Sequence, residues 1–123
     1  MRGTVFVGPE PEALSVGVIR VPKKVPAGKP PAFEDRTYAF IGSEKICGWW
    51  VYDVTNPAQA EFVTYFTTRH PEIAPFDDTD ADLSPEGSVF VSAADSPTGK
   101  PLLIAGNEVT STTSVYEIEV NPL

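Results

Sequence analysis

Four glutamates stand at corresponding places in the two halves of the chain, and their carboxylates are the groups best suited to chemistry. Glu12 and Glu86 each follow a proline and precede an apolar run, whereas Glu44 and Glu108 each end a Gly-x-Glu triplet. Convergent carboxylate oxygens suit hard divalent cations such as Ca²⁺, so Glu12 and Glu86 are candidate metal ligands. Glu44 and Glu108 are candidates for a substrate-binding or a structural role. The alternative for all four is that they serve turns, each carboxylate accepting backbone N–H groups.

A second acidic group lies between the two halves. Asp78, Asp80 and Asp82 have Asp-x-Asp-x-Asp spacing, and alternate carboxylates in a tight loop can wrap a Ca²⁺ ion from one side. An EF-hand would need glycine at the sixth position and glutamate at the twelfth, where this chain has Leu83 and Val89. The segment is therefore either a weaker metal loop or a solvated acidic loop.

Other reactive side chains are few. Arg36 and Arg69 could neutralise a phosphate or pair with the acidic loops. Cys47 is the single cysteine, so no intrachain disulfide can form, and we expect it in a turn between two strands. His70 is the only histidine and is expected to be solvated, so no Ser-His-Asp arrangement can be assembled. Catalysis by this chain alone would rest on carboxylates and a bound metal, with the catalytic residues unknown.

The net charge and the distribution of apolar residues argue against two classes of partner, nucleic acids and membranes. The chain has 9 basic against 17 acidic residues, a formal net charge of −8, which repels phosphate backbones and anionic lipid. We therefore expect no nucleic-acid partner. No apolar stretch reaches the roughly 18 residues of a membrane span, so no membrane insertion is expected. The first eight residues lack the apolar core and cleavage site of a signal peptide.

The elements that must position these residues are strands. Alternating apolar residues and turn signals predict an all-β chain without helices, and the expected strands are 13–21, 37–42, 49–54, 61–67, 88–93, 102–106 and 113–120. The segments 39–44 and 50–54 recur 64 residues later as 103–108 and 114–118. Repetition of a small β unit is typical of propellers and solenoids, because one unit cannot bury its own faces.

Four antiparallel strands joined by hairpins make one propeller blade. The chain is accordingly predicted to be a single partial β-propeller domain, WD40-like in type, with two four-stranded antiparallel blades. The first blade would span about residues 8–68 and the second about 82–120. The second lacks its outermost strand, which residues 2–7 could supply if the chain ends meet.

Several motifs in order resemble a known family. They are GPEPE (8–12), RTYAFIG (36–42) followed by Glu44, VYDVTNP (51–57), DLSPEG (82–87), ADSPTGKPLL (94–103) and NEV (107–109). Together, over roughly residues 8–120, they are similar to the C-terminal part of the choice-of-anchor I propeller proteins. That family contains bacterial secreted or cell-surface proteins often labelled alkaline phosphatase-like or esterase-like. Its members are several times longer, so the chain resembles their last two blades, with Cys47 and Trp49 where the family tends to have small residues.

The resemblance implies three alternatives and an extracellular or cell-surface location. In the first, the chain is a fragment or truncated member that acts as a structural or binding module. Its partners would be further blades or copies of itself, because open blades leave sheet faces unburied. In the second, it is a Ca²⁺-dependent phosphoester hydrolase. In the third, three or four copies with two blades each close a ring of six or eight blades.

Overall fold

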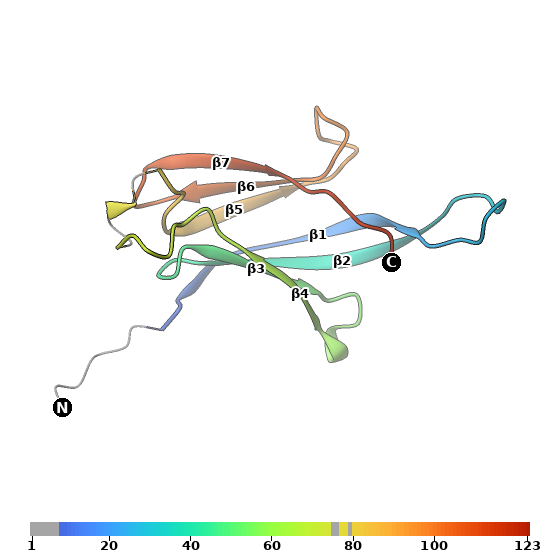
Figure 1. The fold of residues 1–123 in the computed structure, drawn as a ribbon, viewed down its shortest axis with the longest axis horizontal. Helices are drawn as coiled ribbons and strands as arrows, with labels where there is room; N and C mark the ends of the chain where they lie inside the picture. Colours follow the sequence, from blue (N-terminus) through green and yellow to red (C-terminus); the bar gives the residue numbers. More distant parts are fainter. Residues whose placement is uncertain (1–7, 75–76, 79) are drawn as a thin grey trace.

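The chain forms two antiparallel sheets that lie one above the other (Figure 1). The computed structural model describes residues 8–74, 77–78 and 80–123. The first sheet has the order β1-β2-β3-β4 and the second the order β5-β6-β7. Their strands are β1 (Pro11–Lys23), β2 (Ala32–Ser43), β3 (Gly48–Asp53), β4 (Glu61–Phe66), β5 (Pro85–Val91), β6 (Leu102–Asn107) and β7 (Thr112–Glu117).

The prediction of an all-β chain is confirmed. The helical element with described bounds is the short 3₁₀ turn η1 (Pro57–Gln59), and the described residues form no helix able to cross a membrane. β1 and β2 are longer than predicted, because their pairing continues to Lys23 opposite Ala32, beyond the expected strand ends at residues 21 and 37. The second sheet has three strands among the described residues, and the proposed fourth strand, 2–7, lies outside them.

The two sheets repeat one backbone design. Their second and third strands correspond at an offset of 64 residues, since Gly42 pairs with Trp49 and Gly106 with Thr113. Their first strands correspond at an offset of 74 residues, and each carries a bulge just after its proline, at Pro11 or Pro85.

The residues before these bulges repeat the design in finer detail. Glu10 and Ser84 both have positive φ, at 46° and 59°. Each also uses its carbonyl in the same way: the Glu44 amide donates to Glu10 and the Glu108 amide donates to Ser84, both at 2.9 Å. The two copies that the sequence repeat indicates therefore share their backbone geometry as well as their side chains.

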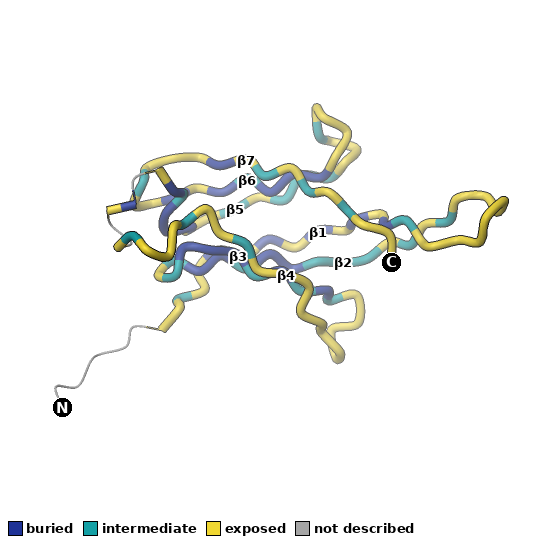
Figure 2. Tube along the Cα trace, in the orientation of Figure 1, coloured by how far each residue is buried: buried dark blue, intermediate teal, exposed yellow. Residues whose placement is uncertain are grey.

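The main core lies between the two sheets (Figure 2). Phe90 of β5 stacks on Phe40 of β2 with ring centroids 5.9 Å apart and lies directly against the backbone of Gly17, where a Cβ would collide with the ring. The Ser15 and Ser88 hydroxyls are 2.6 Å apart, so the two inner strands meet through small side chains. The buried core residues are Ala13, Ile19, Val21, Phe40, Trp49, Val51, Leu103 and Ala105.

Candidate functional site

The outward face of the first sheet is apolar and exposed. In a sheet with one solvated face, the outward residues are usually polar, but β1 places Leu14, Val16 and Val18 outward with 62%, 54% and 56% of their surface exposed. The strand register continues this surface across β2, β3 and β4. The first outer face is formed by Leu14, Val16, Val18, Ala39, Ile41, Trp50, Tyr52, Phe62 and Tyr65.

Two aromatic pairs join β3 and β4 on the first outer face. The ring of Trp50 lies 6.1 Å from that of Tyr65, and Tyr52 meets Phe62 edge to face at 5.6 Å. Such cross-strand pairs stabilise neighbouring strands. They also extend the apolar surface from β1 to β4, and contiguous exposed apolar surfaces of this kind mark interaction sites.

The outward face of the second sheet has the same character on a smaller scale. Val89, Ile104 and Val115 lie side by side across β5, β6 and β7, and the two valines are each 60% exposed. These three residues and Val91 form the second outer face.

The repeat offsets show what the first outer face corresponds to. Val16 corresponds to Phe90, and Ala39 corresponds to Leu103. Phe90 and Leu103 belong to the inner side of the second sheet, which packs on the first sheet. The exposed first outer face is thus the counterpart of a face that is buried in the same molecule.

The second outer face has the complementary correspondence. Ile104 is the counterpart of Phe40, and Val115 is the counterpart of Val51. Phe40 and Val51 are buried residues on the inner side of the first sheet. The two sheets therefore pack head to tail, and each end presents the face that the other end could bury.

A cluster of carboxylates lies at the β1 bulge, beside the end of β2. Glu10, Glu12 and Glu44 place carboxylate oxygens within 4.8 Å of one another. Repulsion from Glu44 is the main cause that raises the pKa of Glu12, with smaller contributions from burial, Glu10 and Glu86. The sequence singled out Glu12 and Glu44 but missed Glu10, although the alternate glutamates of the GPEPE motif were a signal for it.

Lys45 supplies the cluster with a positive charge. Its ammonium lies 2.7 Å from Glu44 and 3.4 Å from Glu10, and its hydrogen bond lowers the pKa of Glu44. Glu86 and Glu108 are exposed and belong to no comparable cluster among the described residues. Ca²⁺ binding by Glu12 and Glu86, and a hydrolase activity that would depend on it, stay predictions.

The three aspartates of the loop have different surroundings. Asp78 is buried, with 1% of its residue surface exposed, and it accepts the His70 amide at 2.6 Å and lies 2.9 Å from His70 Nδ1. This contact raises the pKa of His70. Asp82 accepts the Tyr116 hydroxyl at 3.0 Å, while Asp80 is exposed. His70, expected to be solvated, is half exposed but anchored through its ring.

The two candidate arginines have different surroundings. Arg36 contacts Asp53 at 2.6 Å and Glu34 at 3.3 Å, the structural ion pairing that was one of its two predicted roles. Burial opposes ionisation of Asp53, but hydrogen bonds from Thr55 and Arg36 outweigh it and lower the pKa of Asp53. Arg69 makes a smaller contribution to the lowered pKa of Asp78, after the hydrogen bonds from His70.

Cys47 and the two tryptophans lie in the turn before β3 and on β3 itself. Cys47 lies in the turn before β3, as expected, with φ of 58°, and its thiol is buried. Trp49 is 2% exposed in the core, and Trp50, the next residue along β3, points to the opposite side of the sheet.

Comparison of the chain with protein-family models, curated proteins and solved structures finds no match.

Proposed function

We propose that the chain is a structural and binding module, a two-sheet part of a β-propeller whose outer faces bind further sheets of the same kind. One observation carries the proposal: each outer face is the repeat counterpart of a face that is buried between the two sheets. A repeat that buries one face on its neighbour needs another neighbour, or a cap, for its second face. Among the described residues no segment covers either outer face, since Leu14, Val16, Val18, Val89 and Val115 are all more than half exposed.

The arrangement of the exposed apolar residues favours a binding surface. Isolated surface valines are ordinary, but here they form continuous rows that cross several strands. Continuous exposed apolar patches mark interaction sites in proteins. An extracellular or cell-surface location belongs to the same proposal and rests on the family resemblance.

A second copy of the chain offers both complementary faces. The first outer face of one copy would bury the second outer face of the next, repeating the packing seen within the chain. Such a contact is head to tail, so it closes into a ring when the rotation permits and otherwise grows as an open filament. Three or four copies would supply the six or eight sheets of common propellers.

The test is the mass of the protein in solution, measured by size-exclusion chromatography with light scattering over a range of concentrations. We expect the wild-type chain to associate. Val16→Lys blocks the first outer face and Val89→Lys blocks the second, because each replaces an exposed valine at the centre of a row. Ala27→Lys, in the exposed β1–β2 loop, is the matched control and should associate like the wild type.

Head-to-tail packing makes a sharper prediction about mixtures. Each blocked variant keeps one competent face, so Val16→Lys and Val89→Lys should be monomeric alone and form a one-to-one complex when mixed. A wild-type chain that stays monomeric and unfolds in one sharp transition contradicts the proposal. Variants that each still form dimers alone contradict the head-to-tail geometry.

A further inference from the structure

We propose that the outer edge of β7 accepts an extended peptide strand from a partner, which completes the second sheet and fills the groove beside it. The first sheet has four strands and the second has three, so β7 is an edge where β3 is paired on both sides. Within the part of the chain that the structure describes, β7 pairs only with β6. This edge is distinct from the two outer faces.

The backbone groups that β7 offers to a strand can be assigned. The Ile118 amide donates to the Pro101 carbonyl at 2.8 Å, which marks this pair as hydrogen-bonded. Hydrogen-bonded and non-bonded pairs alternate along an antiparallel ladder. By this alternation, Thr113, Val115 and Glu117 direct their N–H and C=O groups away from β6, toward the free edge.

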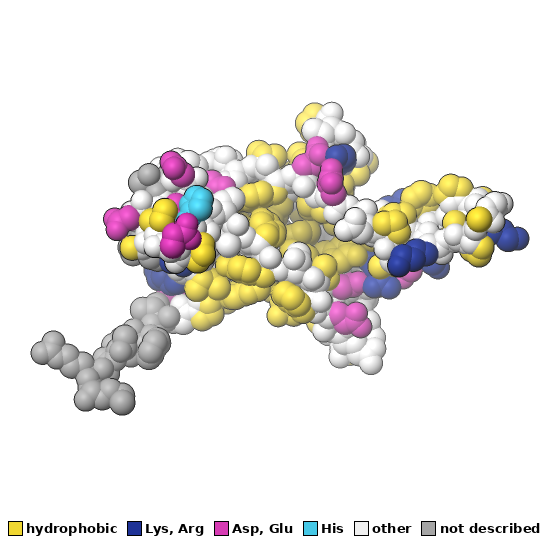
Figure 3. All heavy atoms as spheres, viewed as in Figure 1, with side chains coloured by type: hydrophobic (Ala, Val, Ile, Leu, Met, Phe, Trp, Pro, Cys, Tyr) yellow, Lys and Arg dark blue, Asp and Glu magenta, His cyan; other side chains and the backbone are white. Residues whose placement is uncertain are grey.

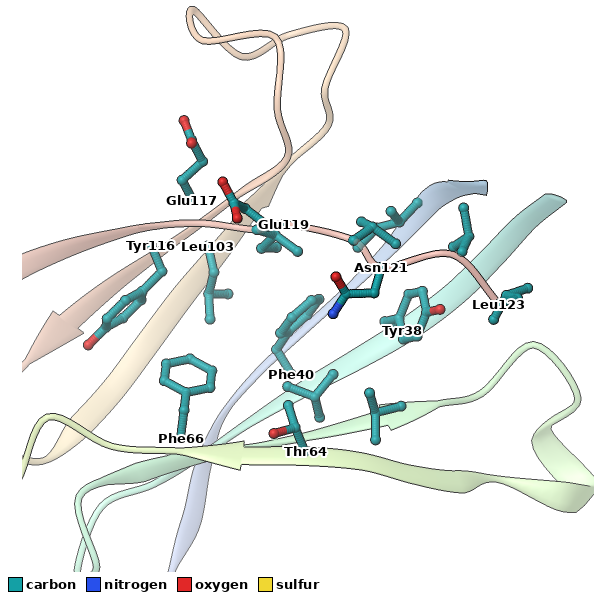
Figure 4. A pocket seen from close by; sticks show the side chains of 16 residues that line it. Tyr38, Phe40, Thr64, Phe66, Leu103, Tyr116, Glu117, Glu119, Asn121 and Leu123 are labelled. Atoms are coloured by element: carbon teal, nitrogen blue, oxygen red, sulfur yellow. The ribbon is translucent and has the colours of Figure 1, made fainter. Parts of the chain in front are cut away.

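The groove beside this edge has room for side chains. It has a volume of about 600 Å³ and runs between β7 with the C-terminal tail and β4 (Figure 4). At one end of the groove Tyr116 packs edge to face on Phe66 with ring centroids 5.2 Å apart, and beyond this pair Leu103 and Thr64 line its two sides. Apolar side chains gather along the same middle part of the molecule (Figure 3). The groove exists because the second sheet ends one strand short of the first.

β4 shows what kind of strand fits. In the first sheet, Phe62 of β4 lies opposite Tyr52 of β3 and packs edge to face against it. The counterpart of Tyr52 in the second sheet is Tyr116, which already lines the groove. An incoming strand with an aromatic residue at the position of Phe62 would place its ring against Tyr116. The residue at the position of Tyr65 would lie beside Ser114, which is buried and accepts a hydrogen bond from Asn107 at 2.7 Å.

The partner is therefore an extended segment with an aromatic side chain on the groove side, opposite Tyr116, and an uncharged or basic character. The chain carries a formal net charge of −8, which disfavours an acidic peptide. Addition of a strand to an exposed sheet edge is a common mode of peptide binding, in which backbone hydrogen bonds supply affinity and side-chain pockets supply specificity.

The probe is a synthetic peptide with the sequence of residues 60–67, flanked by lysines for solubility and titrated into the full chain. We expect saturable binding, with new protection from hydrogen exchange at the amides of Val115 and Glu117. Thr113→Pro removes one outward N–H without touching the β6 ladder and should weaken binding about tenfold or more, the loss expected for one unpaired backbone partner. Thr113→Val keeps the N–H and the branched shape, and Thr113 is not part of either outer face, so this variant should bind like the wild type.

A modified peptide keeps the test independent of how the variants fold. Methylation of alternate peptide amides removes the donors that face β7, and it should abolish binding to the wild-type chain. No saturable binding, equal binding of the methylated peptide, or protection at β3 through displacement of β4 would overturn the proposal. Association between copies is measured without peptide and depends on Val16 and Val89, so failure of the strand site and failure of the module proposal are distinguishable.

Discussion

The contact between Gly17 and Phe90 makes the packing of the two sheets sensitive to a single methyl group. A Cβ at Gly17 would overlap three ring atoms of Phe90, and the ring cannot swing away freely because Phe40 stacks on it at 5.9 Å. Forcing an extra carbon into a packed core costs about 1–3 kcal/mol, and loss of an aromatic pair about 0.5–1.5 kcal/mol. We therefore expect Gly17→Ala to destabilise the chain by about 2 kcal/mol, despite the better strand propensity of alanine.

The assay is urea unfolding followed by tryptophan fluorescence, with the midpoint falling and the slope unchanged. Gly87→Ala is the matched control, because Gly87 is also in an inner strand but a Cβ there would meet nothing within 4 Å. It should change stability by no more than about 0.5 kcal/mol. In a Phe90→Leu background, Gly17→Ala should cost less, since the obstructing ring is gone. A neutral Gly17→Ala, or an equal cost in both backgrounds, would refute the packing argument.

Three further predictions concern buried groups. The pKa of His70 is raised in the folded chain, so its pairing with Asp78 stabilises the fold below about pH 6.5. This contribution is lost as pH rises through the folded pKa. The urea midpoint should therefore fall between pH 5.5 and pH 8.5 in the wild type, and it should not show this fall in Asp78→Asn. Arg36→Ala should lower the urea midpoint at pH 7, because it leaves Asp53 without its charged partner. Since the pKa of Asp53 is lowered, the difference from wild type should shrink as pH falls below about 3.9, as acid titration of the midpoint would show. Leu103→Ala, at a site with no exposed surface, should cost about 2–5 kcal/mol by the same measurement.

Local patterns were enough to predict the strands. Period-two alternation placed β1 and β7 within a few residues of their observed bounds, because a strand with one buried side has to repeat every second residue. The 64-residue repeat likewise predicted two similar hairpin units, and the shared bulges show why it was reliable. Repeated sequence codes for repeated backbone when the same turns and bulges recur.

Contacts across loops could not be predicted in the same way. Asp78 and His70 meet because the loop between them turns back on itself, and neither residue type nor spacing indicates such a turn. The carboxylate cluster joined Glu12 to Glu44 because β1 and β2 pair at that end. Glu86, at the equivalent position of the second sheet, contributes to the raised pKa of Glu12 but lies outside the cluster of Glu10, Glu12 and Glu44.

The sequence by itself determined the all-β character, the two repeated units and the strand order within each hairpin, because these depend on local alternation and on short turns. Only the tertiary structure decided which side of each sheet is covered. Both sides of the first sheet are apolar, so alternation alone cannot say which side meets the second sheet. The strand register and the close contact between Gly17 and Phe90 determine which side of the first sheet is buried. The opposite side, its counterpart on the second sheet and the edge of β7 are left open to partners.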